Sequence, residues 1–345
     1  MRLLIKLAAV TVLCTASPVG AQETDSTAVS PPLDIVILPI VNYSERMEAH
    51  EVLLPRLHYR LEEVGLAFLT SEELRPFLRE SRIRSRGWVG RNDAQAIAEH
   101  TGARYLLLGS WDVYRTEIDP EVGFSLRVLD LESLELVASV SRGKTGSDFT
   151  GFLGLGTVRD PVELADRVMK EAVKDLFPIE VSEKPKDEED GVCRDLALIP
   201  MDNFSSTANA GDIVSNVLIT ELLRAGYRVV EPGFVREMGL ERGVINRGGV
   251  DRLSAGGILH EIKSCRVITG EVETFATAPG SPLVSTPRVA FGVRVMLPRE
   301  GTVGIMQDLE GAGDDTEWLF QQGRTHALIP VTIRAVRRFV DTLDD

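Results

Sequence analysis

Histidines and cysteines are the residues of this 345-residue chain best suited to metal binding or nucleophilic chemistry. The five histidines are His50, His58, His100, His260 and His326. None of them pairs with another histidine or with a cysteine at the spacing of a zinc site. No Gly-x-Ser-x-Gly motif occurs, and no serine or cysteine has an evident histidine partner. The sequence therefore predicts no metal site, no cofactor and no catalytic triad.

Two further patterns imitate functional motifs. Gly151, Gly154 and Gly156 resemble a phosphate-binding loop, but no Gly-Lys-Ser/Thr follows them and they come after an expected hairpin. Asp314 and Asp315 are neighbouring carboxylates in a polar segment, where adjacent side chains project in different directions. Both patterns are better explained as a loop and a solvated surface than as sites.

The segment at residues 149–156 is unusually apolar for a loop, and its counterpart at residues 316–320 is aromatic. Loops are normally polar, so an apolar loop either folds back onto the core or contacts a partner or a membrane. Both interpretations remain open from the sequence. The candidate contact residues are Phe149, Phe152, Leu153, Leu155, Trp318, Leu319 and Phe320.

The elements that must position these residues occur twice. Residues 34–109 align with residues 195–270 at a constant shift of 161, without a gap and with 17 identities in 76 positions. A later shift of 167 pairs Phe124 with Phe291 and Arg127 with Arg294. A repeat of this length indicates a duplicated structural unit.

Each copy shows the same order of expected elements, β-α-β-α-α-β-β-β-α. The short apolar runs at 35–38 and 196–199 are typical of buried parallel strands, and leucines at helical spacing follow each of them. Residues 124–129 and 136–140 predict a hairpin. We expect an α/β fold of two tandem three-layer domains. Each has a mixed sheet, with a parallel β-α-β core plus an antiparallel hairpin, covered by helices.

Several local signals refine this expectation. Thr70 and Glu73 form a capping-box pattern, and Asn92 is in position to cap a third helix. Pro55 should kink the first helix or mark its effective start. Asn42-Tyr43-Ser44 and Asn203-Phe204-Ser205 match a glycosylation pattern, but a repeated turn after the first strand explains them better.

The N-terminus has the features of an export signal. Arg2 and Lys6 flank an apolar stretch that is too short to span a bilayer, and small residues precede Gln22. Cys14 suggests a lipid anchor, but Leu13 stands where a lipobox has a small residue. We expect a signal peptide at 1–21, a linker at 22–33, a first repeat at 34–178, an acidic linker at 179–192 and a second repeat at 193–345.

The charge argues against nucleic acid as a partner. The formal net charge is −14, and removal of Arg2 and Lys6 with the signal would make it −16. Such a surface repels phosphate backbones. The charge itself names no partner, and peripheral membrane association and oligomerisation remain open.

Cys193 and Cys265 are the two cysteines that remain after processing. They precede the first and third strands of the second copy. A 2-1-3 strand order places these strands side by side and parallel, within the reach of a disulfide. Pro32 and Arg104 stand at the equivalent places in the first copy, so a bond would be specific to the second. Two unrelated buried thiols are the alternative.

A family resemblance appears in two motifs. Residues 37–44 and 198–205 resemble an opening strand that ends in an apolar-Pro-x-x-Asn-x-Ser turn, and residues 102–109 resemble a later Gly-Ala-x-Tyr-Leu-apolar-x-Gly strand. Both are similar to a bacterial envelope domain. It is shared by the curli secretion channel subunit (CsgG-like), the lipoprotein activator of penicillin-binding proteins and the N-terminal domain of TolB. The resemblance covers roughly 75 residues of each copy.

The resemblance implies a non-enzymatic protein-interaction module that is periplasmic or associated with the outer membrane. It would act as an adaptor or as an assembly or secretion accessory of the cell envelope, and its partners would be envelope proteins. No long alternating hairpins are present to build a membrane barrel, so a secretion pore is not expected. The alternative is a hydrolase or transferase with its site in the cleft between the repeats. A cluster of acid, base and nucleophile there would favour that alternative.

Overall fold

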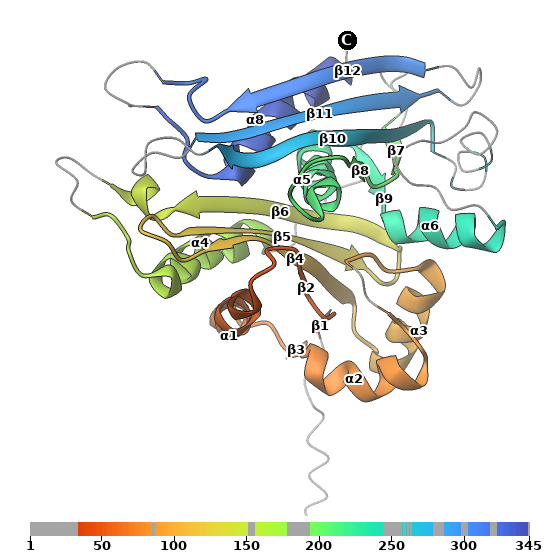
Figure 1. Ribbon diagram of the computed structural model, residues 1–345. Coiled ribbons are helices and arrows are strands. Elements are labelled where there is room, and N and C mark those ends of the chain that lie inside the picture. Colours follow the sequence, from red (N-terminus) through yellow and green to blue (C-terminus); the bar gives the residue numbers. More distant parts are fainter. Residues whose placement is uncertain are drawn as a thin grey trace, which may run out of the picture. The chain divides into compact units, whose positions relative to one another are not determined.

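The computed structural model describes residues 34–84, 87–150, 156–177, 194–243, 257, 260, 262, 264–278, 286–297, 303–317 and 323–343. All of them belong to one compact unit, Pro32–Asp345 (Figure 1). Within these ranges, no helix combines the length and apolar character that a bilayer crossing demands.

The first repeat contains six strands among its described residues. They are β1 (Ile35–Ile37), β2 (Val41–Asn42), β3 (Phe68–Leu69), β4 (Tyr105–Arg115), β5 (Glu121–Asp130) and β6 (Glu135–Thr145). Its helices are α1 (Met47–Glu63), α2 (Ser71–Glu80), α3 (Arg91–Thr101) and α4 (Pro161–Leu176), with a short 3-10 helix η1 (Gly146–Phe149).

The second repeat follows the same plan. Its strands are β7 (Asp195–Leu198), β8 (Asp202–Asn203), β9 (Arg228–Val230), β10 (Arg266–Ala278), β11 (Thr286–Met296) and β12 (Val303–Ala312). Its helices are α5 (Ala210–Arg224), α6 (Pro232–Glu241) and α8 (Leu328–Val340), followed by the 3-10 helix η3 (Asp341–Leu343).

The two sheets have the same strand order. The first is β3-β1-β4-β5-β6 with β2 beside β4, and the second is β9-β7-β10-β11-β12 with β8 beside β10. The first three strands of each sheet are parallel, and the hairpin strands are antiparallel. The α/β fold class with two similar mixed sheets flanked by helices is therefore confirmed, as is the 2-1-3 order at the centre of each sheet.

The repeated Asn-x-Ser segments form turns, as expected. The Asn42 side chain accepts hydrogen bonds from the amide of Ser44 at 3.1 Å and from its hydroxyl at 2.6 Å. Asn203 accepts the same two bonds from Ser205. Side-chain acceptors that bond the backbone two residues on stabilise such turns in both copies.

Of two expectations about helix starts, that for Asn92 was wrong, and that for Pro55 loses one of its two alternatives. Helix α1 begins at Met47 and continues through Pro55 to Glu63, so that proline does not mark the start of the helix. Helix α3 begins after Gly90 and has no cap from its own side chains. Instead, the carboxylate of Glu237, from the second repeat, accepts hydrogen bonds from the backbone amides of Arg91 and Asn92. The capping box of Thr70 and Glu73 on α2 is confirmed.

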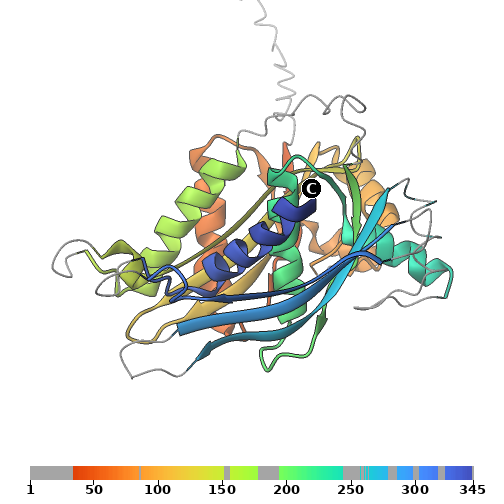
Figure 2. The same cartoon turned by 90° about the horizontal axis from the view of Figure 1, so that it is seen from above.

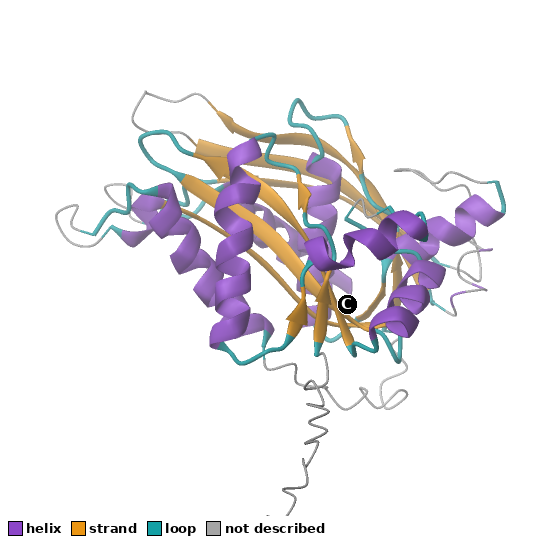
Figure 3. Ribbon diagram, turned by 90° about the horizontal axis from the view of Figure 1, so that it is seen from below, coloured by secondary structure: helices purple, strands orange, loops and turns teal. Residues whose placement is uncertain are grey.

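The layers are shared between the repeats. Helices α1 and α4 pack on one face of the first sheet (Figure 3), where they bury an apolar cluster that includes Leu53, Leu57 and Trp111. Helices α5 and α8, which belong to the second repeat, lie between the two sheets (Figure 2). They contact both β6 of the first repeat and the strands of their own sheet, so one apolar core extends across both repeats.

Two glycines make room for this docking. A Cβ atom on Gly123 of β5 or on Gly143 of β6 would lie 2.8 or 2.7 Å from Ile329 of α8. By strand register the equivalent positions in the second sheet are Ala290 and Glu310. Glycines thus admit α8 to the first sheet, and α8 also packs on the second sheet, where a Cβ atom on Gly311 of β12 would lie 3.1 Å from Val331.

The predicted disulfide has a direct test. Cys265 is disulfide-bonded, and its partner lies outside the described residues. The amide of Cys265 donates to Asp195, two residues after Cys193, at 3.0 Å. We therefore expect non-reducing peptide mapping of the exported protein to give one linked pair, Cys193 with Cys265. Its reduction should cost about 4 kcal/mol of stability. Two alkylatable thiols, or a link to Cys14, would contradict the pairing.

Candidate functional site

The repeats are joined by a buried ion pair. Nε of Arg127, on β5, lies 2.9 Å from a carboxylate oxygen of Glu231, the residue before α6. The side chains are 3% and 0% exposed. A buried charge is tolerated only when its partners are complete, because its loss of hydration costs several kcal/mol.

The surroundings complete that requirement. The Arg127 guanidinium also donates to the carbonyl of Gly87 and to Asn216 of α5, and it stacks 4.5 Å from the ring centre of Trp88. Glu231 accepts a further bond from the backbone amide of Val89. The pair therefore fixes the β5 strand of one repeat against two helices of the other.

A line of hydroxyl groups continues from this pair across the interface. The Ser125 hydroxyl donates to Asp112 at 2.6 Å, and hydroxyl contacts of 2.7 to 2.9 Å join Ser125, Ser141, Thr220 and Ser139. Burial raises the pKa of Asp112 to about 7, although hydrogen bonds to its carboxylate oppose the rise. These groups are held by one another and lie between the sheet and α5.

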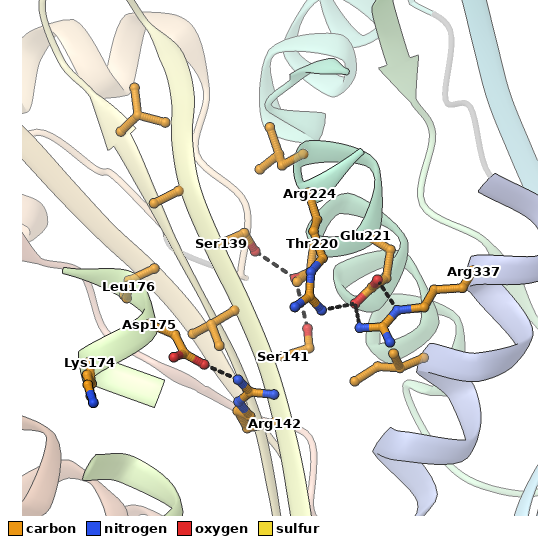
Figure 4. A pocket seen from close by; sticks show the side chains of 15 residues that line it. Ser139, Ser141, Arg142, Lys174, Asp175, Leu176, Thr220, Glu221, Arg224 and Arg337 are labelled. Atoms are coloured by element: carbon orange, nitrogen blue, oxygen red, sulfur yellow. Dashed lines mark hydrogen bonds and ion pairs between the residues drawn. The ribbon is translucent and has the colours of Figure 1, made fainter. Parts of the chain in front are cut away.

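A groove of about 580 Å³ opens at the edge of this interface (Figure 4). Its floor is six consecutive residues of β6, from Val137 to Arg142. One wall is the end of α4, with Lys174, Asp175 and Leu176. The other wall consists of α5 and α8, and its residues are Thr220, Glu221, Leu223, Arg224, Ile333 and Arg337. The groove is therefore the place where the repeats meet at a strand edge.

The groove is more cationic than the chain as a whole. Four of its residues are basic and two are acidic, which gives +2 in a chain of −14. Arg142 pairs with Asp175, and Arg337 pairs with Glu221 at 2.6 Å. Lys174 also lines the groove, and Arg224, whose side chain is 63% exposed, lies 3.9 Å from the Glu221 carboxylate.

The lining offers binding chemistry and little catalytic chemistry. The described lining residues include hydroxyls, guanidinium groups and apolar side chains but neither histidine nor cysteine. The hydroxyls of Ser139 and Ser141 each contact Thr220, and Ser141 also contacts Ser125, which donates to Asp112. Across the described part of the chain, no cluster of three potential metal-ligating side chains is found.

Phe149 is the one predicted contact residue that the structure describes. It is half-buried against its own domain, with Lys144 4.8 Å and Arg167 5.2 Å from its ring centre. The other six residues, Phe152, Leu153, Leu155, Trp318, Leu319 and Phe320, and the cysteine at 193 lie outside the described residues. The structure therefore folds the described start of the apolar loop back onto the core.

Sequence reasoning missed the groove and the ion pair. Arg127 aligns with Arg294, so the duplication alone gives no reason to treat the two arginines differently. The sequence does contain one signal, which is the smaller side chains of the first copy. Gly143 and Ser141 align with Glu310 and Asp308 of the second copy. Small residues on a strand that is otherwise well packed indicate a close approach by another element.

No family model matches the sequence. No curated protein matches it either.

Solved structures give partial matches. The PelC dodecamer of Paraburkholderia phytofirmans is 17% identical, with a TM-score of 0.30 over 42% of this chain and 87% of that chain. Lipoprotein GNA1162 of Neisseria meningitidis is 18% identical, with 0.28 over 34% and 78%. The C-terminal domain of LpoB from Escherichia coli is 14% identical, with 0.26 over 38% and 90%. At these scores the likenesses carry no argument about function.

The buried pair predicts an asymmetry between the aligned arginines. Replacing Arg127 with Met leaves the Glu231 carboxylate buried without its partner, which should destabilise the protein by about 3–5 kcal/mol. The matched change, Arg294→Met, removes a pair with Glu271 whose side chains are 34% and 33% exposed, and should cost less than about 1 kcal/mol. Urea denaturation measures both variants. Equal losses would contradict the role given to Arg127.

Proposed function

We propose that this chain is a non-enzymatic protein-interaction module of the cell envelope. In this proposal it is exported by its signal peptide and works in the periplasm or at the outer membrane. Its two repeats act as one rigid adaptor in assembly or secretion. Partner proteins bind in the groove along β6.

The groove is the observation that carries this proposal. It combines a strand edge with which no described strand pairs, apolar side chains such as Leu223 and Ile333, and the positive charge of Lys174. Surfaces that mix apolar contacts with a few oriented charges are typical of protein recognition. The hydroxyls nearby contact each other, which supports a binding role over a hydrolase or transferase.

The fixed interface supports an adaptor in a second way. The groove walls come from both repeats, since α4 belongs to the first and α5 and α8 to the second. Docking by the Arg127–Glu231 pair therefore sets the distance between the walls. A partner that binds here contacts both repeats at once.

Photocrosslinking in the native cell tests the proposal. A photoreactive residue in place of Val137, inside the groove, should crosslink to one envelope protein. The same residue in place of Tyr59 on α1, which is 56% exposed, should not. Reversing the charge with Arg224→Glu should reduce the groove crosslink about tenfold, because it removes a cation from the contact. Identical products from both positions would contradict the proposal. So would a hydrolytic activity of the purified protein that Thr220→Val abolishes.

A further inference from the structure

Strand β6 ends the first sheet. It pairs with β5 on one side, and no described strand pairs with it on the other. An unpaired edge presents backbone amides and carbonyls to whatever lies beside it. All six β6 residues from Val137 to Arg142 line the groove, which shows that the groove follows this edge.

The hydrogen-bond pattern identifies which groups face the groove. The amide of Gly146 donates to the carbonyl of Pro120 at 2.9 Å, next to the pair Glu121 and Thr145. Bonded and non-bonded pairs alternate along an antiparallel ladder. Val140 and Arg142 therefore bond β5, whereas Ser139 and Ser141 direct their amides and carbonyls away from β5. Ser139 is half-buried, and Ser141 is only 3% exposed.

The two walls would meet opposite faces of an added strand. Arg142 and Lys174 lie on the α4 side, and Arg224 and Arg337 on the other side. Side chains of a strand alternate between its faces, so both faces of an added strand would meet cations. Leu223 and Ile333, which are half-buried, supply apolar contacts on the α5 and α8 side, which suit short aliphatic side chains.

We propose that the groove binds an extended acidic peptide segment, which adds to β6 as a further antiparallel or parallel strand. This inference rests on the proposed function and names the partner's chemistry. The outward amide and carbonyl of Ser139 anchor the ladder, and Lys174 and Arg224 attract carboxylates of the segment. Six residues of β6 match a segment of about six residues, roughly 20 Å long.

The corresponding edge of the second sheet differs. Strand β12 is also an outer strand, but its exposed side chains include Asp308 and Glu310, and Leu309 stands where β6 has Arg142. An acidic segment would be repelled there. The charge pattern therefore restricts the proposed strand addition to β6.

The probe for the test is a fluorescent peptide, acetyl-Thr-Glu-Val-Glu-Val-Glu-Thr-amide, titrated into the mature protein by anisotropy. Methylating backbone nitrogens removes donors without changing side chains. One peptide is methylated at its second, fourth and sixth residues, and another at its third and fifth. Because only alternate amides face β6, one methylated peptide should lose at least about tenfold in affinity and the other should keep it. Lysine in place of glutamate should weaken binding by a similar factor.

Arg224→Glu should weaken the unmethylated peptide about tenfold, whereas Arg288→Glu, an equal charge change at an exposed residue of β11, should leave it nearly unchanged. Equal binding by both methylated peptides would overturn strand addition, because it would show attraction by charge alone. Dimerisation that Arg224→Glu abolishes would place a second copy in the groove and overturn the peptide assignment. If no peptide binds while the groove crosslink persists, this inference fails and the proposed function stands. If both are absent, both fail.

Discussion

The docking of the two repeats depends on the buried charge of Arg127, which requires hydrogen-bond acceptors. Arg127 lies on a strand that α5 covers, so its guanidinium has lost its water and needs a complete set of acceptors. Glu231, Asn216 and the carbonyl of Gly87 provide them. Two of the three acceptors belong to the second repeat. Any rotation of one repeat against the other would break this set, which gives the stacked arrangement its specificity.

The other inter-repeat contacts follow from that docking. Glu237 of the second repeat caps α3 of the first, and Glu121 of β5 accepts the amide of Leu328 at the start of α8, at 2.7 Å. Each carboxylate thus accepts hydrogen bonds from amides at the start of a helix in the other repeat, which the helix itself leaves without a partner. The same docking places α5 and α8 over the face of β6 that is turned toward the second repeat. The groove is therefore a consequence of how the repeats stack and is not a property of either repeat alone.

The sequence predicted what is local and repeated, and it failed where the two copies meet. Strand order, the hairpins, the Asn-x-Ser turns and the capping box follow from periodicity and short-range hydrogen bonds. The start of α3 could not be predicted, because its cap comes from Glu237, 145 residues away. Arg127 and Arg294 are identical in type and register, and only tertiary structure buries the first. Glu231 aligns with Thr70 of the first copy, so the alignment does not indicate that Glu231 pairs with Arg127.

The central claim is that β6 presents to the groove a backbone edge with which no described strand pairs. Residue-resolved amide hydrogen exchange of the mature protein tests it most directly. The amides of Val140 and Arg142 should exchange slowly because they bond β5, and that of the half-buried Ser139 should exchange about tenfold faster or more. Addition of the crosslinked partner's acidic segment should slow the exchange of the Ser139 amide and leave Val140 and Arg142 unchanged. Uniform protection along β6 in the free protein, or no change on binding, would contradict the account.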